Sequence, residues 1–63
     1  MITGTVQWFN IKKGYGFIDT DDERVIFVHH SGLEGLIKNN DRVKFNIVPG
    51  EKRYKAINVR KVE

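Results

Sequence analysis

Five short runs of alternating apolar and polar residues, separated by turn residues, limit the fold of this sequence more than any other feature. A period of two is typical of strands with one buried face, and helical periodicity is weak throughout. The expected strands are Ile2 to Asn10, Tyr15 to Thr20, Val25 to His29 or His30, Arg42 to Val48 and Tyr54 to Val62. An open sheet of this size leaves its edges unpaired, so we expect closure. The sequence predicts one all-β domain over residues 1–63, a five-stranded antiparallel barrel.

The segments between these runs carry turn residues. Asp21-Asp22-Glu23-Arg24 is too short to propagate a helix and is interpreted as a charged hairpin loop. Pro49-Gly50 is a turn dipeptide that ends the fourth run. In the longest connection, 31–41, Ser31 is followed three residues later by Glu34. This spacing predicts that Ser31 caps a single helical turn.

The composition excludes several classes of protein. Without cysteine the chain has no disulfide framework, no thiolate nucleophile and no cysteine-based zinc site. Its uncharged apolar runs are too short to span a membrane, and no charged-then-apolar leader precedes the first run. We therefore expect a cytoplasmic protein without a membrane partner. The net charge of +3 is compatible with a polyanionic partner but also with none.

Four of the seven aromatic residues, Trp8, Phe9, Tyr15 and Phe17, lie within ten positions. Successive side chains of a strand point to opposite faces, so Tyr15 and Phe17 share one face of their strand. Ile18 lies on the other face, where we expect the core. Clustered rings on the face opposite the core are unusual for a domain of this size.

The third run repeats this division. Phe27 and His29 share one face, while Ile26 and Val28 share the other and are ordinary core residues. A small barrel has one interior and cannot bury both sets, which places the rings outside. Trp8 has the parity of Val6, a core residue, so its outward placement requires a bulge or sharp bend between the two.

An exposed patch of rings on adjacent strands is not a normal solvated surface. Flat rings beside Lys12 and Lys13 match the needs of unpaired bases, which stack on aromatic side chains while cations contact the phosphates. Gly14 and Gly16 leave space between the rings for a ligand. Two other readings stay open at this point: a second core under a long loop, and a dimer interface.

The sequence resembles the cold-shock domain, the small OB-fold module of bacterial cold-shock proteins and eukaryotic Y-box proteins. The resemblance covers nearly the whole chain and is carried by four segments: Gly4-Thr5-Val6-Gln7-Trp8-Phe9-Asn10, Lys13-Gly14-Tyr15-Gly16-Phe17-Ile18, Ile26-Phe27-Val28-His29-His30-Ser31 and Ala56-Ile57-Asn58-Val59. The middle two resemble the family's two ribonucleoprotein motifs. The resemblance implies an OB-fold barrel that binds single-stranded RNA or DNA, as an RNA chaperone or transcription antiterminator.

The site that follows from the rings and the resemblance has two parts. Asn10 is either a base contact or a turn former, and Tyr15 stands where the family usually has Phe. The expected stacking residues are Trp8, Phe9, Tyr15, Phe17, Phe27, His29 and His30. The expected backbone or polar contacts are Gln7, Asn10, Lys12, Lys13, Lys52, Arg53, Tyr54 and Lys55.

Several positions depart from the family pattern. Gln7 stands where a lysine is usual, and His30 stands where bacterial members usually have Phe. The connection after Ser31 is about three residues shorter than usual and lacks an aromatic residue. Residues 52–55, with Arg53-Tyr54-Lys55 in place of a Gly-Pro stretch, are expected to form a second contact strip. The alternative is that Tyr54 packs on the barrel edge and the charges are merely solvated.

Catalytic and metal sites are not expected. His29 and His30 should point oppositely on a strand, and Asp21-Asp22-Glu23 lacks the ligand spacing of a calcium loop. Ser31 has no third group to complete a catalytic triad with His30. We expect a monomeric, non-enzymatic binding module without cofactor. The competing hypothesis is a protein-interaction barrel, or a strand-exchanged dimer hinged at the short 31–41 connection.

Overall fold

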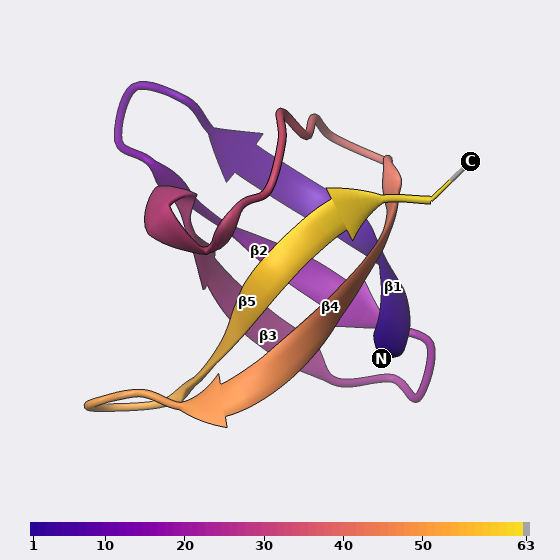
Figure 1. The fold of residues 1–63 in the computed structure, drawn as a ribbon, viewed down its shortest axis with the longest axis vertical. Coiled ribbons are helices and arrows are strands. Elements are labelled where there is room, and N and C mark those ends of the chain that lie inside the picture. The colour runs from indigo at the N-terminus through magenta and orange to yellow at the C-terminus, as the bar shows by residue number, and fades with distance from the viewer. Residues whose placement is uncertain (63) are drawn as a thin grey trace.

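The alternating runs form five strands that close into a barrel, in a computed structural model that describes residues 1–62 (Figure 1). The elements are β1 (Ile2–Asn10), β2 (Tyr15–Thr20), β3 (Val25–His29), the short 3₁₀ turn η1 (His30–Gly32), β4 (Arg42–Pro49) and β5 (Tyr54–Lys61). Every strand begins where the sequence predicts, and each ends within one residue of the predicted position. The all-β, five-stranded barrel is therefore confirmed.

Neighbouring strands follow the order β1-β2-β3-β5-β4 around the barrel. Four ladders are antiparallel, as expected, but β3 and β5 pair in parallel through Phe27 with Lys55 and Val28 with Ala56. A closed ring with an odd number of strands cannot alternate direction at every step, so one neighbouring pair must be parallel. The purely antiparallel description is amended at this ladder.

The interior of the barrel is filled by apolar side chains from every strand. Val6, Ile18, Ile26 and Val28 are buried as predicted. The remaining buried apolar residues are Ile37, Val43, Phe45, Ala56 and Val59. Each buried aliphatic or aromatic side chain stabilises the fold by about 1.5–3 kcal/mol relative to exposure. Phe45 is the largest of the fully buried side chains, and it occupies the interior in place of the rings of β2 and β3.

A β-bulge in β1 separates the inward and outward residues of that strand. Val6 pairs with Ile18 but Trp8 pairs with Phe17, which leaves Gln7 as the extra residue. The bulge lets Val6 face the core and Trp8 face outward, as the parity of the sequence required. The backbones approach closely beside it, because a Cβ on Gly16 would lie 2.2 Å from the carbonyl oxygen of Trp8. Only glycine fits this position without a shift of β1.

One connection between strands has the conformation predicted from the sequence, and another does not. The 21–24 segment is a hairpin loop, closed by the amide of Thr20 donating to the carbonyl of Arg24 at 2.8 Å. The helical turn begins earlier than predicted, at His30, directly after β3. Its cap is His29, whose side chain accepts a hydrogen bond from the amide of Ser31. The predicted capping by Ser31 is wrong, and Glu34 instead pairs with Arg60 at 3.1 Å.

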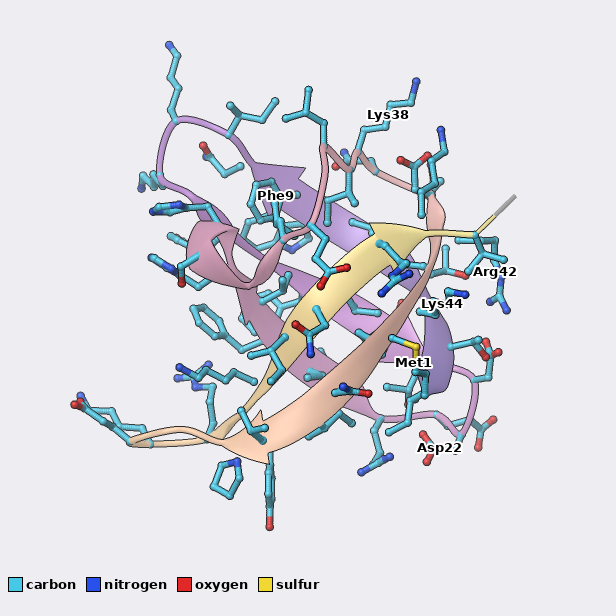
Figure 2. The ribbon with its side chains drawn as sticks, viewed as in Figure 1. Met1, Phe9, Asp22, Lys38, Arg42 and Lys44 are labelled. Atoms are coloured by element: carbon cyan, nitrogen blue, oxygen red, sulfur yellow. The ribbon has the colours of Figure 1, made fainter. Side chains whose placement is uncertain are left out.

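A polar cluster ties the loop after β2 to β1 and β4. Arg42 donates two hydrogen bonds to the carboxylate of Asp21, at 2.7 and 2.9 Å, and the hydroxyl of Thr3 donates a third. Figure 2 shows Arg42 at the side of the barrel where these elements meet. Hydrogen bonding from Arg42, then from Thr3, holds the pKa of Asp21 well below its ordinary range. The folded state therefore favours the ionised carboxylate.

The stability of the barrel should fall in acid through this carboxylate. Because its pKa is lower in the folded chain than the ordinary value of about 3.9, the contribution is complete above that value and is lost as pH falls toward the folded-state pKa. We expect Asp21→Asn to lower the melting temperature at pH 7, and the gap to wild type to narrow below about pH 4. Asp19→Asn is the control, since Asp19 takes part in no ion pair within residues 1–62. A gap that stays constant from pH 7 to 2.5 would contradict this account.

Gly16 supplies a second test of the fold. The added methyl of Gly16→Ala would collide with the backbone of β1, so we expect a loss of about 1–3 kcal/mol in the free energy of unfolding. Gly35→Ala is the matched control, because a Cβ there meets no atom within 4 Å. Urea unfolding of both variants measures the difference. Equal midpoints for the two variants would show that the close approach at the bulge is not required.

Candidate nucleic-acid interface

Five rings on three adjacent strands form one outward face, which we call the aromatic surface: Trp8 of β1, Tyr15 and Phe17 of β2, and Phe27 and His29 of β3. The register aligns them in rows across the sheet. Trp8 lies opposite Phe17, which lies opposite Phe27, and Tyr15 lies opposite His29. All five are partly exposed and none belongs to the buried core. The reading of these rings as a second core is therefore wrong.

The rings of the aromatic surface hold one another in place. Trp8 packs edge-on against Tyr15 and Phe17, with ring centroids 5.6 and 5.5 Å apart. Phe27 packs edge-on against Phe17 at 5.9 Å and is stacked with Tyr15 at 6.1 Å. Such contacts are favourable in themselves and restrict the side-chain rotamers. A flat ligand that stacks here meets side chains that are already ordered.

His30 extends this surface at the end of β3. The strand stops at His29 and the chain turns into η1, which brings the two imidazole rings to a centroid distance of 4.2 Å. The expectation that they point oppositely is wrong, because it assumed a continuous strand. Gly14 lies beneath His30, since a Cβ there would come within 2.5 Å of its ring. Within residues 1–62 no group of three or more His, Cys, Asp or Glu is placed to hold a metal ion.

Phe9 does not belong to the aromatic surface. It follows Trp8 on the opposite face of β1, pairs with Gly16 and packs against the core cluster. Figure 2 shows Phe9 beside the connection that leads into β4, and its amide donates to the side chain of Asn39 at 3.0 Å. The predicted stacking role of Phe9 is corrected for a simple reason. Successive strand residues point to opposite faces, so Trp8 and Phe9 cannot both face outward. The bulge shifts the parity of β1 by one residue, which turns Trp8 outward and Phe9 inward.

The polar residues near β1 divide into turn formers and exposed groups. The side-chain oxygen of Asn10 accepts a hydrogen bond from the amide of Lys13 at 3.0 Å, which identifies Asn10 as a turn former in the free protein. Lys12 and Lys13 are exposed in the turn that follows. Gln7, the extra residue of the bulge, is exposed on the same side as Trp8. The lysines are thus available to a ligand, and Asn10 shapes the turn that presents them.

The hairpin between β4 and β5 borders the other edge of the aromatic surface. It projects well beyond the barrel (Figure 1). Lys55 lies in register with Phe27, and the guanidinium of Arg53 lies 5.8 Å from the centre of that ring, within cation–π range. A groove of about 410 Å³ runs between the hairpin and the rings. We call it the inner groove, and its lining includes Tyr15, Phe17, Phe27, Lys52, Arg53 and Lys55.

Tyr54 has a different place from its neighbours. It is 60% exposed and does not line the inner groove. This exposure counts against the alternative that Tyr54 packs on the barrel edge. Tyr54 lines a second groove together with Pro49 and Val25, and this groove adjoins the inner groove. From the sequence, Pro49 is predicted only as a turn former and Val25 only as part of a strand. Val25 nevertheless shares the outward-facing parity of Phe27.

The charges of the barrel are distributed unevenly. Among the described residues 1–62 the ion pairs are Arg24–Asp22, Arg42–Asp21, Arg60–Glu34 and Lys61–Asp41. No ion pair within residues 1–62 involves the cations that border the aromatic surface, which are Lys12, Lys13, Lys52, Arg53 and Lys55. Glu51 is the carboxylate of the same hairpin. Five of the seven cations outside these ion pairs therefore border the rings, where they attract anions, and the other two are Lys38 and Lys44.

Comparisons with known proteins agree with this geometry. The family described as "'Cold-shock' DNA-binding domain" matches residues 2–62. The major cold shock protein of Micrococcus luteus is 45% identical, with 98% of this chain and all of that protein covered. The cold shock-like protein CspLB of Listeria monocytogenes is 41% identical over 98% of this chain and all of that protein. The Micrococcus alignment runs over 67 positions, so that relative has residues that this 63-residue chain lacks.

A solved structure supports the fold independently. The Drosophila chain described as Unr CSD456 superposes with a TM-score of 0.80 at 24% identity, over 98% of this chain and 26% of that longer chain. No helix among the described residues is long and apolar enough to cross a membrane. The barrel, its two motifs and a family match over nearly the whole chain lead to one conclusion: this protein belongs to the cold-shock domain family, a family of nucleic-acid-binding OB-folds.

Proposed function

We propose that this protein binds single-stranded RNA or DNA by stacking unpaired bases on its aromatic surface. One observation carries the proposal: five partly exposed rings lie on adjacent strands and are bordered by cations that no ion pair within residues 1–62 occupies. Base–aromatic stacking contributes about 1–3 kcal/mol per base. Lysine and arginine side chains neutralise the phosphates of the same strand. Base stacking and phosphate neutralisation are the two interactions that binding to an unpaired strand requires.

The proposed roles follow from where each side chain lies. Trp8, Tyr15, Phe17, Phe27 and His29 stack bases, and His30 extends the stacking surface. Lys12, Lys13, Lys52 and Lys55 contact phosphates, Arg53 covers the face of Phe27 until a base replaces it, and Gln7 offers an amide beside Trp8. Stacking accepts any base, so we propose binding with little sequence preference.

A protein that holds RNA unpaired in this way acts as an RNA chaperone or transcription antiterminator. Neither role requires a cofactor or a chemical step, and the proposal assigns none. We propose that residues 1–63 act as one domain and as a monomer in the cytoplasm. A monomer requires that one chain can complete the barrel, which the β1–β4 and β3–β5 ladders allow.

Binding to an unpaired strand is tested with oligo-dT of about seven nucleotides, within the range of 4–16 nucleotides per OB-fold. We expect the oligomer to quench the fluorescence of Trp8. Phe17→Ala and Phe27→Ala should each weaken binding by about 1–3 kcal/mol while the barrel remains folded. Phe45→Leu is the control, because it changes a buried ring and should lower stability without lowering the affinity of the folded protein.

Two outcomes would count against the proposal. Absence of binding at low salt would reject it, and unfolding of the Phe17 and Phe27 variants would assign those rings to the core. Size-exclusion chromatography with and without the oligomer distinguishes the protein-interaction alternative. A nucleic-acid binder elutes earlier with the oligomer, whereas an interaction barrel elutes as a self-associated species that the oligomer does not change.

The salt dependence tests the phosphate contacts. For single strands the logarithm of the affinity falls with the logarithm of salt by about 0.7 per phosphate engaged. Lys52→Gln removes one cation of the inner groove. The slope of log affinity against log salt should therefore be shallower for this variant than for wild type by about 0.7. Lys44→Gln is the charge-matched control, since Lys44 lies across the barrel from the β4–β5 hairpin (Figure 2). Equal slopes for the two variants would remove Lys52 from the interface.

A further inference from the structure

A second groove adjoins the inner groove and lies between β3 and the β4–β5 hairpin. It encloses about 700 Å³, and we call it the outer groove. Phe17, Phe27 and residues 50–53 of the hairpin line both grooves, so the two grooves are continuous. Beyond Phe27 the outer groove is lined by Val25, Pro49 and Tyr54. Its volume lies in the range of small-ligand sites, which is ample for a nucleobase and its sugar.

The far end of the outer groove is apolar and uncovered. Val25 faces outward from β3, two residues and about 6.6 Å from Phe27 on the same face. It is 58% exposed, and Tyr54 across the groove is 60% exposed. Neither side chain contributes to the core or to the packing among the rings of the aromatic surface. The groove therefore presents an aliphatic wall and an aromatic ring to whatever enters it.

The charges of the outer groove favour an anionic ligand. Lys52 and Arg53 lie along its hairpin edge, and Arg24 lies at its other end, where its charge is shared with Asp22 at 2.8 Å. Glu51 is the only carboxylate among the lining residues. A ligand that combines a flat ring with a phosphate matches an apolar floor with a cationic edge.

We propose that the outer groove binds one further nucleotide of the same single strand, with its base between Val25 and Tyr54. This inference rests on the proposed function, because the strand reaches the groove only from the aromatic surface. The continuity of the two grooves favours this occupant over a peptide, since a strand stacked on Phe27, which lines both grooves, leads directly into the outer groove. Lys52 and Arg53 then meet the phosphate that joins the two positions.

The test is a length series of oligo-dT from four to ten nucleotides, measured by Trp8 fluorescence. In wild type the affinity should rise by a further step when the oligomer is long enough to fill the outer groove. Tyr54→Ala should reduce that step by about fivefold or more, because it removes one stacking partner. Tyr54→Phe keeps the ring and should retain the step. Melting temperatures show that each variant is folded.

A second pair of variants tests the aliphatic wall. Val25→Asp puts a carboxylate into the outer groove, whereas Val62→Asp makes the same change at an exposed residue outside both grooves. We expect Val25→Asp alone to reduce the gain in affinity with length. If Tyr54→Ala does not fold, the comparison of Val25→Asp with Val62→Asp decides whether a nucleotide occupies the outer groove.

The possible results separate the two proposals. If the affinity of both Tyr54→Ala and Val25→Asp rises with oligomer length as it does in wild type, the proposal of a nucleotide in the outer groove is overturned. The proposed function stays intact in that case. An equal loss at every length would also overturn it, by assigning Tyr54 to the aromatic surface. Failure of wild type to bind any oligomer would reject the proposed function itself, and the groove inference with it.

Discussion

A five-stranded barrel has one small interior, and the rest of this structure depends on how that interior is filled. Phe45 and aliphatic side chains from every strand occupy it. The rings of β2 and β3 alternate with the buried residues and are therefore directed outward. They cover part of one another by edge-on packing and remain partly exposed. The aromatic surface is thus a direct consequence of burial on the opposite face of the same strands.

Two local devices complete the surface. The bulge at Gln7 turns Trp8 outward while Val6 stays in the core, and Gly16 permits the close approach of β2 that accompanies it. Ion pairs elsewhere on the barrel neutralise Arg24, Arg42, Arg60 and Lys61. In the proposed function, the cations left around the rings attract phosphates at long range, and the rings stack bases at short range.

The strands and the inside–outside division of β2 and β3 could be predicted from the sequence, because a period of two reports directly on which face is buried. In β1 the same period places Trp8 with Val6, and the bulge that turns Trp8 outward could not be derived from it. The errors arose where the chain departs from that period. His29 and His30 lie at a strand end, where alternation stops, and Phe9 follows the bulge, where parity shifts by one. The parallel β3–β5 ladder follows from ring closure rather than from any residue pattern. The grooves depend on the path of the 50–53 hairpin, which local sequence does not determine.

The central claim is that the outward rings, and not another face of the barrel, contact unpaired bases. It is tested most directly by two-dimensional NMR of the ring protons during titration with oligo-dT. The account predicts intermolecular NOEs and large shifts for Trp8, Phe17 and Phe27, with the buried ring of Phe45 little changed. Shifts confined to residues around Lys44 and Arg60, with the rings of β1, β2 and β3 unaffected, would contradict it.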